Sequence, residues 1–196
     1  MEYPIKKITN EQLDKLFIKS KLPMNSLMIS IPYSYFSKLV ELSWYDILFA
    51  IENGFLSHQS AIEHAIIELK DNKNYSQIVI NLASLSPDEA VLRRDLIKQY
   101  VNELAKPISD EAKVQTKNKV MYILLHWVYE HKEYYEDSLS VVELIYDDFD
   151  FPKSIANFVR YMPPEQPLLS TVEANIERLH KNWKDYLDKQ AQYWKK

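Results

Sequence analysis

The residues nearest to a metal-ligand pattern lie close to the C-terminus. Glu177 and His180 form a Glu-x-x-His pair, and this three-residue spacing places both side chains on one face of a helix, as carboxylate-bridged di-iron bundles require. Such bundles need a second copy of the pair, but none of the other four histidines has a glutamate three positions before it. The sequence therefore predicts no metal site and no bound cofactor. A metal-dependent enzyme built on Glu177 and His180 is the alternative interpretation.

Two residue types on which many catalytic motifs depend are scarce. The chain of 196 residues has one glycine, Gly54, and no cysteine, whereas average usage of roughly 7% would give about fourteen glycines. Phosphate-binding loops, dinucleotide fingerprints and nucleophile elbows need several glycines. Thiolate zinc sites and cysteine nucleophiles need cysteine. Since most serines stand where helices are expected to begin, capping explains them, and no catalytic residue is predicted.

Negative charge is concentrated in residues 130–150. This segment holds eight acidic residues and one basic residue, so its formal charge is −7, while the whole chain carries −4 and the remaining residues carry +3. Aromatic residues are interleaved with the carboxylates, and tyrosine is over-represented at interface hot spots. Local negative potential also steers basic partners. We therefore predict a protein-binding surface whose candidate residues are Glu136, Asp137, Tyr146, Asp147, Asp148 and Asp150.

Two alternatives to this binding surface stay open. The acidic segment could be a solvated loop whose aromatic side chains point into the core. The contact patch could instead lie around Tyr33, Tyr35 and Phe36, an aromatic cluster next to Pro32. Nucleic acid is not an expected partner, because the isoelectric point is about 5.8 and the basic residues cluster in pairs rather than in stripes.

Helix-start signals recur along the chain and predict an all-α fold. Capping-box patterns begin at Thr9, Ser86, Ser140 and Ser170, where the side-chain oxygen accepts a hydrogen bond from the third helical N–H group. A long helix over residues 109–134 is apolar nearly all round in its second half, so we expect it at the centre of the core. The sequence predicts a single multi-helix globular domain over residues 1–196, with about nine helices.

Prolines in three segments lead to more specific predictions of local structure. Residues 27–31 lie in a segment with two prolines and suit a short extended stretch better than a helix. Pro152 is expected to begin a helix that runs to residue 161. Residues 162–167 contain three prolines and form a stiff connection before the C-terminal helix.

Apolar side chains at helical spacing predict which faces are buried. One helix is expected over residues 86–105 and another from residue 170 to about residue 194. Trp44 and Trp127 are also predicted to pack in the core, because each lies in an apolar helical stretch. The stripe of the first helix is Leu92, Leu96, Tyr100 and Leu104, and that of the second is Val172, Ile176, Leu179, Trp183, Tyr186 and Leu187.

Membrane insertion and secretion are not expected. The longest apolar run spans residues 120–129 and is interrupted by His126, while a membrane-spanning helix needs about 20 apolar residues. The N-terminus lacks a basic start followed by an apolar stretch, so it does not resemble a secretory signal. A chain without cysteine also suits a reducing compartment. We therefore expect a cytoplasmic protein.

One stretch carries a resemblance to a known family. Residues 42–57 read LSWYDILFAIENGFLS, and AIEHA follows at residues 61–65. This pattern resembles the N-terminal signature of an uncharacterised family of small bacterial all-helical proteins, some of them thought to be immunity proteins of polymorphic toxin systems. The resemblance implies a helical fold and brings no catalytic motif with it.

These observations favour a non-enzymatic binding protein. The leading hypothesis is an immunity protein that neutralises a basic toxin, such as a nuclease, by covering its active surface with the acidic segment. The alternatives are the metal-dependent enzyme that uses Glu177 and His180 and a scaffold protein. The sequence leaves the oligomeric state open.

Overall fold

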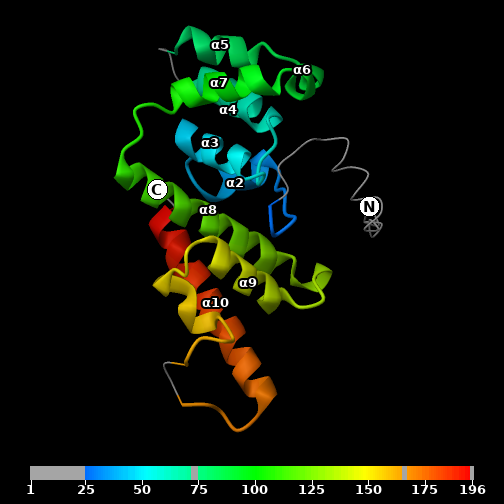
Figure 1. Ribbon diagram of the computed structural model, residues 1–196, viewed down its shortest axis with the longest axis vertical. Helices are drawn as coiled ribbons and strands as arrows, with labels where there is room; N and C mark the ends of the chain where they lie inside the picture. Colours follow the sequence, from blue (N-terminus) through cyan, green and yellow to red (C-terminus); the bar gives the residue numbers. More distant parts are fainter. Residues whose placement is uncertain (1–24, 72–74, 165–166, 195–196) are drawn as a thin grey trace.

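The structure confirms the predicted all-α fold. The computed structural model describes residues 25–71, 75–164 and 167–194, and within these ranges the chain forms nine α-helices, two 3₁₀-helices and no strand (Figure 1). The α-helices are α2 (Tyr33–Leu39), α3 (Trp44–Glu52), α4 (Gln59–Asp71), α5 (Gln77–Ala83), α6 (Pro87–Leu92), α7 (Arg94–Leu104), α8 (Asp110–Glu130), α9 (Ser138–Asp148) and α10 (Val172–Trp194). The 3₁₀-helices are η1 (Lys132–Tyr134) and η2 (Lys153–Phe158). The predicted capping box at Thr9 lies outside the described residues.

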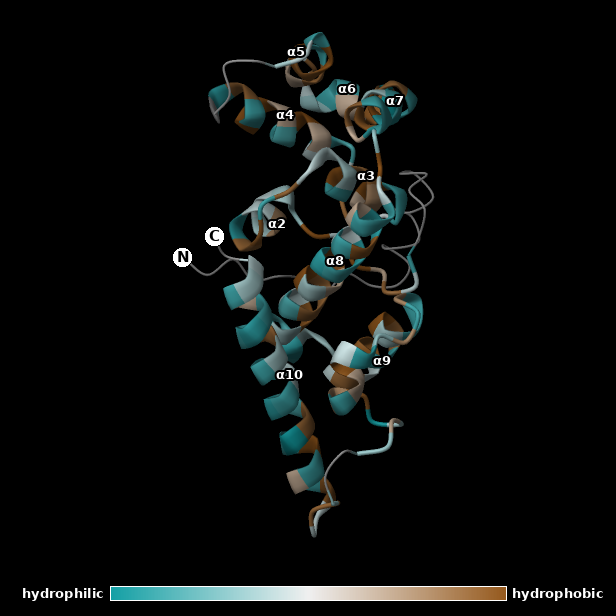
Figure 2. Ribbon diagram, turned by 90° about the vertical axis from the view of Figure 1, so that its left-hand side faces the viewer, coloured by the Kyte–Doolittle hydropathy of each residue, from teal (hydrophilic) through white to brown (hydrophobic). Residues whose placement is uncertain are grey.

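The helices form an elongated molecule with α8 at its middle. Helices α4 to α7 gather at one end, and α9 and α10 lie at the other (Figure 1). Helix α8 packs against α3, α9 and α10, and α3 packs in turn against α7. Helix α10 extends beyond α9 at its N-terminal end (Figure 2). None of the described helices has the length and apolar character needed to cross a membrane.

The central position predicted for the helix over residues 109–134 is confirmed. Its side chains from Val120 to Leu125 are all buried, as is Val128, so this part of α8 has no solvent face. Ser109 caps the helix by accepting from the backbone N–H of Ala112. The helix ends earlier than expected, at Glu130, and a 3₁₀ turn follows.

The helix predicted over residues 86–105 is two helices. Ser86 and Glu89 form the expected capping box at the start of α6. The chain leaves helical geometry at Arg93, where φ is −114° and ψ is 35°, and α7 then begins in a new direction. The interruption rotates the buried face, so Leu92 is 82% exposed and Ile97 is fully buried. The prediction that Leu92 is buried was wrong. The other residues of the predicted stripe, Leu96, Tyr100 and Leu104, are half-buried, and α7 buries Ile97 and Val101 instead.

Two other predicted helix starts were displaced. The cap of α9 is Asp137, whose carboxylate accepts from the N–H groups of Leu139 and Ser140, so Ser140 lies inside the helix. At α10, the hydroxyl of Thr171 accepts from the N–H of Ala174 at 3.1 Å, one residue after the predicted cap. The segment after Pro152 is the 3₁₀-helix η2 rather than a longer α-helix.

The segment at residues 27–31 is neither helix nor strand, and the predicted extended stretch is interrupted at its start, where Leu27 lies in a turn closed by the hydrogen bond from the N–H of Met28 to the carbonyl of Asn25. Ile29 and Ile31 are buried, and the N–H of Ile31 donates to the carbonyl of Phe55 at 2.9 Å. Met28, directly before Ile29, has a positive φ of 50°. The segment therefore packs against the turn that follows α3.

Among the described residues, most positions with left-handed backbone are occupied by residues other than glycine. Gly54, which follows α3, has a φ of 72°, the left-handed conformation that commonly ends a helix. Asp150 and Phe151, with φ values of 64° and 56°, are also left-handed. Phenylalanine rarely adopts this region. The N–H of Phe151 donates to the carbonyl of Tyr146 at 2.9 Å, which closes the end of α9.

The fully buried tryptophan is Trp183. Trp44 and Trp127 pack against the core, yet both are only half-buried, so their predicted core position holds in part. Trp183 has no exposed surface, while Val172 and Ile176 near the start of the same helix are 70% and 40% exposed. The apolar stripe predicted for α10 is therefore buried only toward its C-terminal half.

Candidate functional site

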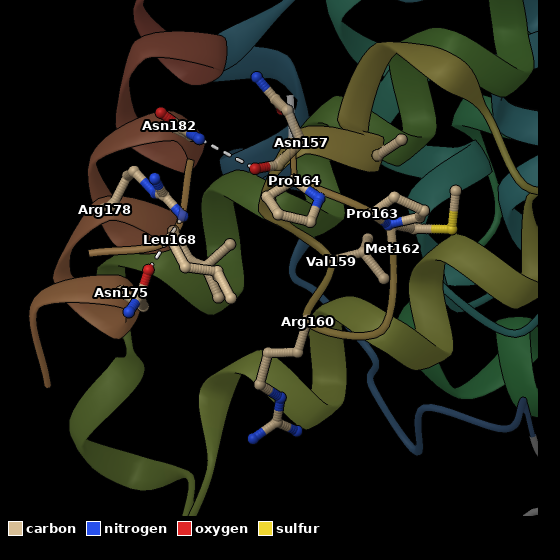
Figure 3. A pocket seen from close by; sticks show the side chains of 12 residues that line it. Asn157, Val159, Arg160, Met162, Pro163, Pro164, Leu168, Asn175, Arg178 and Asn182 are labelled. Carbon is tan, nitrogen blue, oxygen red and sulfur yellow. Dashed lines mark hydrogen bonds between the residues drawn. The ribbon is translucent and has the colours of Figure 1, made fainter. Parts of the chain in front are cut away.

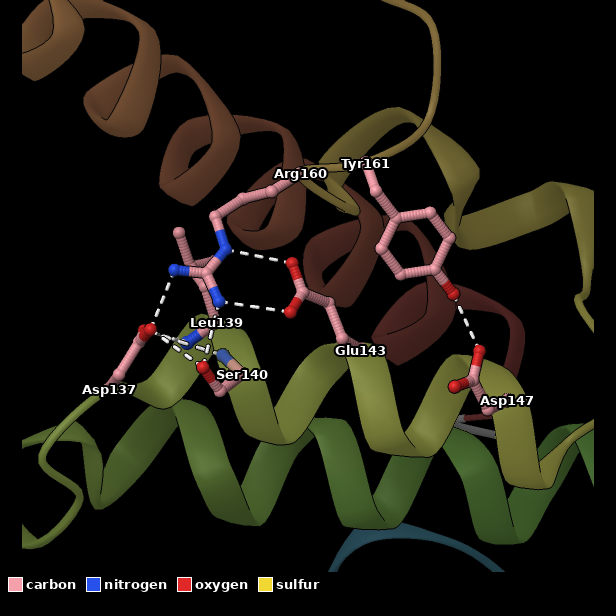
Figure 4. Close-up of polar contacts among 7 residues, drawn as sticks. All are labelled: Asp137, Leu139, Ser140, Glu143, Asp147, Arg160 and Tyr161. Carbon is pink, nitrogen blue, oxygen red and sulfur yellow. Dashed lines mark hydrogen bonds and ion pairs between the residues drawn. The ribbon is translucent and has the colours of Figure 1, made fainter.

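Arg160 organises the carboxylates at the start of α9. Its Nε and Nη2 atoms donate to the two oxygens of Glu143 at 2.8 and 2.9 Å, and its Nη1 donates to Asp137 at 2.6 Å. Nη2 also lies 2.8 Å from the hydroxyl oxygen of Ser140 (Figure 4). Such a bidentate pair fixes the guanidinium in one geometry. Ser140 and Glu143, which the sequence suggested as a capping box, serve here to bind Arg160.

Asp137 has two roles in this network. Besides capping α9, its second oxygen accepts from the hydroxyl of Ser140 at 2.7 Å. The hydrogen bond from Ser140, together with Arg160, holds the pKa of Asp137 below its usual value. The hydrogen bond to Glu143 is the main cause that raises the pKa of Arg160. Both groups are therefore charged at neutral pH.

We expect the substitution Arg160→Ala to lower the free energy of unfolding at pH 7 by on the order of 1 kcal/mol, since the network is partly exposed. The pKa of Asp137 is lowered in the folded state. The ionised Asp137 carboxylate therefore contributes fully to stability above the unfolded carboxyl pKa of about 4, and this contribution is lost as the pH falls through the pKa of Asp137 in the folded protein. Urea titrations at pH 7 and pH 3 test this. If Arg160→Ala lowers the free energy of unfolding equally at pH 7 and pH 3, this expectation is contradicted.

Two exposed aromatic side chains lie beside the carboxylates of α9. The hydroxyl of Tyr161 donates to Asp147 at 2.6 Å (Figure 4), and this bond raises the pKa of Tyr161 to about 12. The rings of Tyr161 and Phe151 lie 6.0 and 5.4 Å from the ring of Tyr146. Tyr146 itself is 3% exposed, while Phe151 and Tyr161 are 59% and 54% exposed. The predicted contact residue Tyr146 is therefore buried and supports the two aromatic rings that reach the surface.

The remaining predicted carboxylates lie apart from the Arg160 network. Asp148 accepts a hydrogen bond from Ser26, and Asp150 pairs with Lys117 at 2.5 Å. Both line a polar hollow of about 460 Å³ between α3, α8 and the end of α9. Glu136 is exposed, and no hydrogen bond or ion pair joins it to another side chain in the part of the chain that the structure describes.

The acidic segment keeps a net negative charge after these pairings. Its eight carboxylates and Lys132 give −7, and the two cations that reach in from outside the segment, Lys117 and Arg160, leave −5. We call the surface formed by Glu136, Asp137, Glu143, Asp147, Phe151 and Tyr161 the acidic face; the side chain of Glu143 is only 21% exposed. It combines carboxylates with two exposed aromatic rings.

A cavity of about 150 Å³ adjoins the acidic face. It lies between η2, residues 162–164, Leu168 and α10, and Arg160 forms part of its wall while its guanidinium points to α9 (Figures 3 and 4). Its lining residues are Ala156, Asn157, Val159, Arg160, Met162, Pro163, Pro164, Leu168, Asn175, Arg178, Leu179 and Asn182.

Hydrogen bonds from α10 hold the wall of this cavity. Arg178 donates to the carbonyl of Pro167 at 2.7 Å, and Asn175 exchanges hydrogen bonds with both backbone groups of Leu169 at 3.0 Å. Asn182 donates to the carbonyl of Asn157 at 2.9 Å (Figure 3). Residues 167–169 are thus held against α10 by hydrogen bonds.

The Glu-x-x-His pair shows no further ligands around it. Glu177 is exposed, and His180 is half-buried with its ring 6.1 Å from that of Trp183. Burial, assisted by the charge of Lys132, lowers the pKa of His180. Across residues 25–71, 75–164 and 167–194, no three His, Cys, Asp or Glu side chains are grouped as a metal ion would require.

The aromatic cluster around α2 contacts two histidines. The hydroxyl of Tyr33 lies 2.9 Å from Nδ1 of His64, and that of Tyr35 lies 2.7 Å from Nδ1 of His126. Burial lowers the pKa of His64 to about 4. Tyr35 also donates to Glu130 at 2.7 Å. This cluster, our alternative contact patch, therefore connects α2 to α4 and α8.

The polar residues of the family-like signature have structural roles. Asp46 is 1% exposed and accepts from the backbone N–H of Ser43 at 2.7 Å, from the Thr116 hydroxyl at 2.5 Å and from Lys119 at 2.6 Å. Trp44 donates to Glu68 at 2.7 Å. These contacts join α3 to α8 and α4.

The sequence did not reveal the cations that pair with the acidic segment. Arg160 lies 17 and 23 positions from the two carboxylates that it contacts, and Lys117 lies 33 positions from Asp150. The available signal was weak: Arg160 is one of only four arginines in the chain and follows an acidic stretch. Arg178, a second arginine, fastens the cavity wall.

Comparison with known proteins identifies the family to which the chain belongs. No curated protein and no solved structure matches the sequence. A family model described as "Uncharacterized protein conserved in bacteria (DUF2247)" matches residues 33–191, which covers most of the chain and includes the signature at residues 42–65. The chain therefore belongs to the DUF2247 family of uncharacterised bacterial proteins.

Proposed function

We propose that this protein is a non-enzymatic binding protein that neutralises a basic protein toxin, as an immunity protein does. The observation that supports this proposal is the acidic face, where Arg160 and Tyr161 hold carboxylates in fixed positions beside exposed aromatic rings. We also propose a cytoplasmic location, in keeping with a sequence that lacks cysteine.

Fixed carboxylates suit this role for energetic reasons. A side chain that is already held in one conformation loses less entropy when a partner binds. Glu143, Asp137 and Asp147 each accept a hydrogen bond from Arg160 or Tyr161, so their positions are set before binding. The residual charge of the segment attracts a cationic partner and raises the association rate.

A toxin that acts on nucleic acid would present such a partner surface. Enzymes that bind nucleic acid use lysine and arginine side chains to contact phosphates. A protein that places carboxylates and aromatic rings over those cations competes directly with the nucleic acid. Inhibition then needs no chemistry from the inhibitor.

Reversing charges on the acidic face should slow association with the toxin. In the double variant Glu136→Lys with Asp147→Lys, we expect the association rate with the cognate basic toxin, to be identified from the neighbouring genes or by co-purification, to fall about tenfold or more at low salt, because steering acts on the encounter step. The dependence of that rate on ionic strength should also become weaker. Stopped-flow measurements at low and high salt would show both effects.

A matched control separates local charge from total charge. The variant Asp95→Lys with Glu103→Lys makes the same charge change on exposed positions of α7, at the other end of the molecule (Figure 1), and should leave the rate nearly unchanged. Equal rates and equal salt slopes for wild type and the acidic-face variant would refute the proposal.

A further inference from the structure

We infer that the cavity beside the acidic face receives one aromatic or branched aliphatic side chain of the same basic partner. This inference rests on the proposed function and adds an anchoring position to it. The acidic face would bind the cations of the partner, while the cavity would take the apolar side chain next to those cations.

The size and lining of the cavity fit a single apolar side chain. Its volume is about 150 Å³, and an apolar cavity of about this size holds benzene. Most of its wall is apolar, from Val159, Met162 and the two prolines on one side to Leu168 and Leu179 on the other. Arg178 and three asparagines add donors at the wall, so a tyrosine hydroxyl is acceptable as well.

The cavity is formed before any ligand binds. Arg178, Asn175 and Asn182 fasten the backbone of its wall from α10. Pro163 and Pro164 further restrict the backbone on the other side. A preformed pocket binds with less loss of conformational entropy than one that must be ordered on binding.

Apolar side chains continue outward from the cavity onto the free end of α10. Leu168, Leu169, Val172 and Ile176 are 74%, 47%, 70% and 40% exposed. Soluble proteins seldom expose apolar side chains in a group unless the group serves an interaction. The cavity with this rim therefore has the character of an anchoring pocket in an interface.

The carboxylates next to the cavity favour a basic partner. The two arginines of the cavity wall are already engaged, Arg160 by Asp137, Ser140 and Glu143 and Arg178 by Pro167 and Asn175. Residues Val159 to Tyr161 run from the cavity wall to the acidic face, and Arg160 contributes to both. The carboxylates that Arg160 holds lie one arginine side chain away from the cavity wall. A partner whose apolar anchor is flanked by lysine or arginine matches both surfaces at once.

Short capped peptides test the inference on the full chain. The probes are Lys-Lys-Phe-Lys-Lys, Lys-Lys-Ala-Lys-Lys and Glu-Glu-Phe-Glu-Glu, titrated against labelled protein while the amide resonances of residues 156–164 and 168–182 are followed. We expect the cationic phenylalanine peptide to bind about tenfold or more tightly than the alanine peptide, because its ring leaves water. It should also bind more tightly than the acidic peptide.

Two variants test whether the phenylalanine ring binds in the cavity. Leu168→Ser removes part of the wall and should abolish the advantage of the phenylalanine peptide without changing the affinity for the alanine peptide. Leu92→Ser is the matched control, since Leu92 is 82% exposed on α6 and distant from the cavity (Figure 1). It should change neither affinity.

The outcomes distinguish failure of the pocket from failure of the proposed function. Equal binding of the two cationic peptides overturns the pocket and leaves the charge-based proposal standing. If the acidic peptide binds as tightly as the cationic phenylalanine peptide, the basic partner is wrong. Self-association of the wild type that Leu168→Ser abolishes would assign the cavity to a second copy of this chain and would also overturn the inference.

Discussion

Replacing Trp183 with alanine is expected to lower the free energy of unfolding by about 3–5 kcal/mol. Its side chain has no exposed surface, and its ring contacts those of Tyr129 and Phe158 at centroid distances of 5.1 and 6.2 Å. Truncation would leave a large cavity where α10 packs against α8 and η2. Chemical denaturation monitored by far-UV circular dichroism measures the loss.

Three further variants show whether burial causes this effect. Trp44→Ala and Trp127→Ala remove the same side chain from half-buried positions and should cost less. Trp183→Phe keeps most of the apolar volume and removes an indole N–H that has no hydrogen-bond partner among the described residues, so it should cost the least. A Trp183→Ala variant as stable as Trp44→Ala would contradict this account of the core.

The substitution Asp46→Ala should cost about as much, on the order of 3–5 kcal/mol, because it leaves a charged partner of a largely buried pair uncompensated. Asp46 and Lys119 are 1% and 14% exposed in their side chains and lie 2.6 Å apart. The backbone N–H of Ser43 and the hydroxyl of Thr116 would lose an acceptor as well. Thermal and urea unfolding of the variant measure the effect.

A double-mutant cycle isolates the ion pair from the other contacts of Asp46. In the background of Lys119→Met, Asp46→Ala should cost less than in the wild type, because no buried cation is left without its partner. Asp110→Ala is the exposed control, since its pair with Lys113 lies at the surface, and it should change stability little. Purely additive costs for Asp46 and Lys119 would show that the pair is not coupled.

Local signals allowed the helices to be predicted, and packing decided their limits. The Ser86 capping box and the apolar second half of α8 depend on neighbouring residues, so sequence reasoning located both. Arg93 has no local signal that ends a helix. On either side of the break, α6 packs against α4, and α7 packs against α3 and α5; such contacts with distant residues are not visible in the local sequence.

The candidate site was predictable in charge and not in geometry. Counting carboxylates located the acidic segment, because charge is a property of composition. The positions of those carboxylates depend on Arg160 and Lys117, which approach from other elements. Tyr146 looked like a contact residue by type, but α9 turns it inward, and Phe151 and Tyr161 take its place at the surface.

Three non-glycine residues in the described part of the chain have a positive φ, and this bears on the unfolded chain. Met28, Asp150 and Phe151 hold left-handed backbone, which costs an L-residue about 1–2 kcal/mol. Glycine would remove that cost but would increase the number of unfolded conformations, and avoiding it contributes about 0.4–1 kcal/mol at each suitable position. A chain of 196 residues with one glycine therefore loses less conformational entropy on folding. Its stability comes in part from a restricted unfolded state, which offsets the strain at the end of α9.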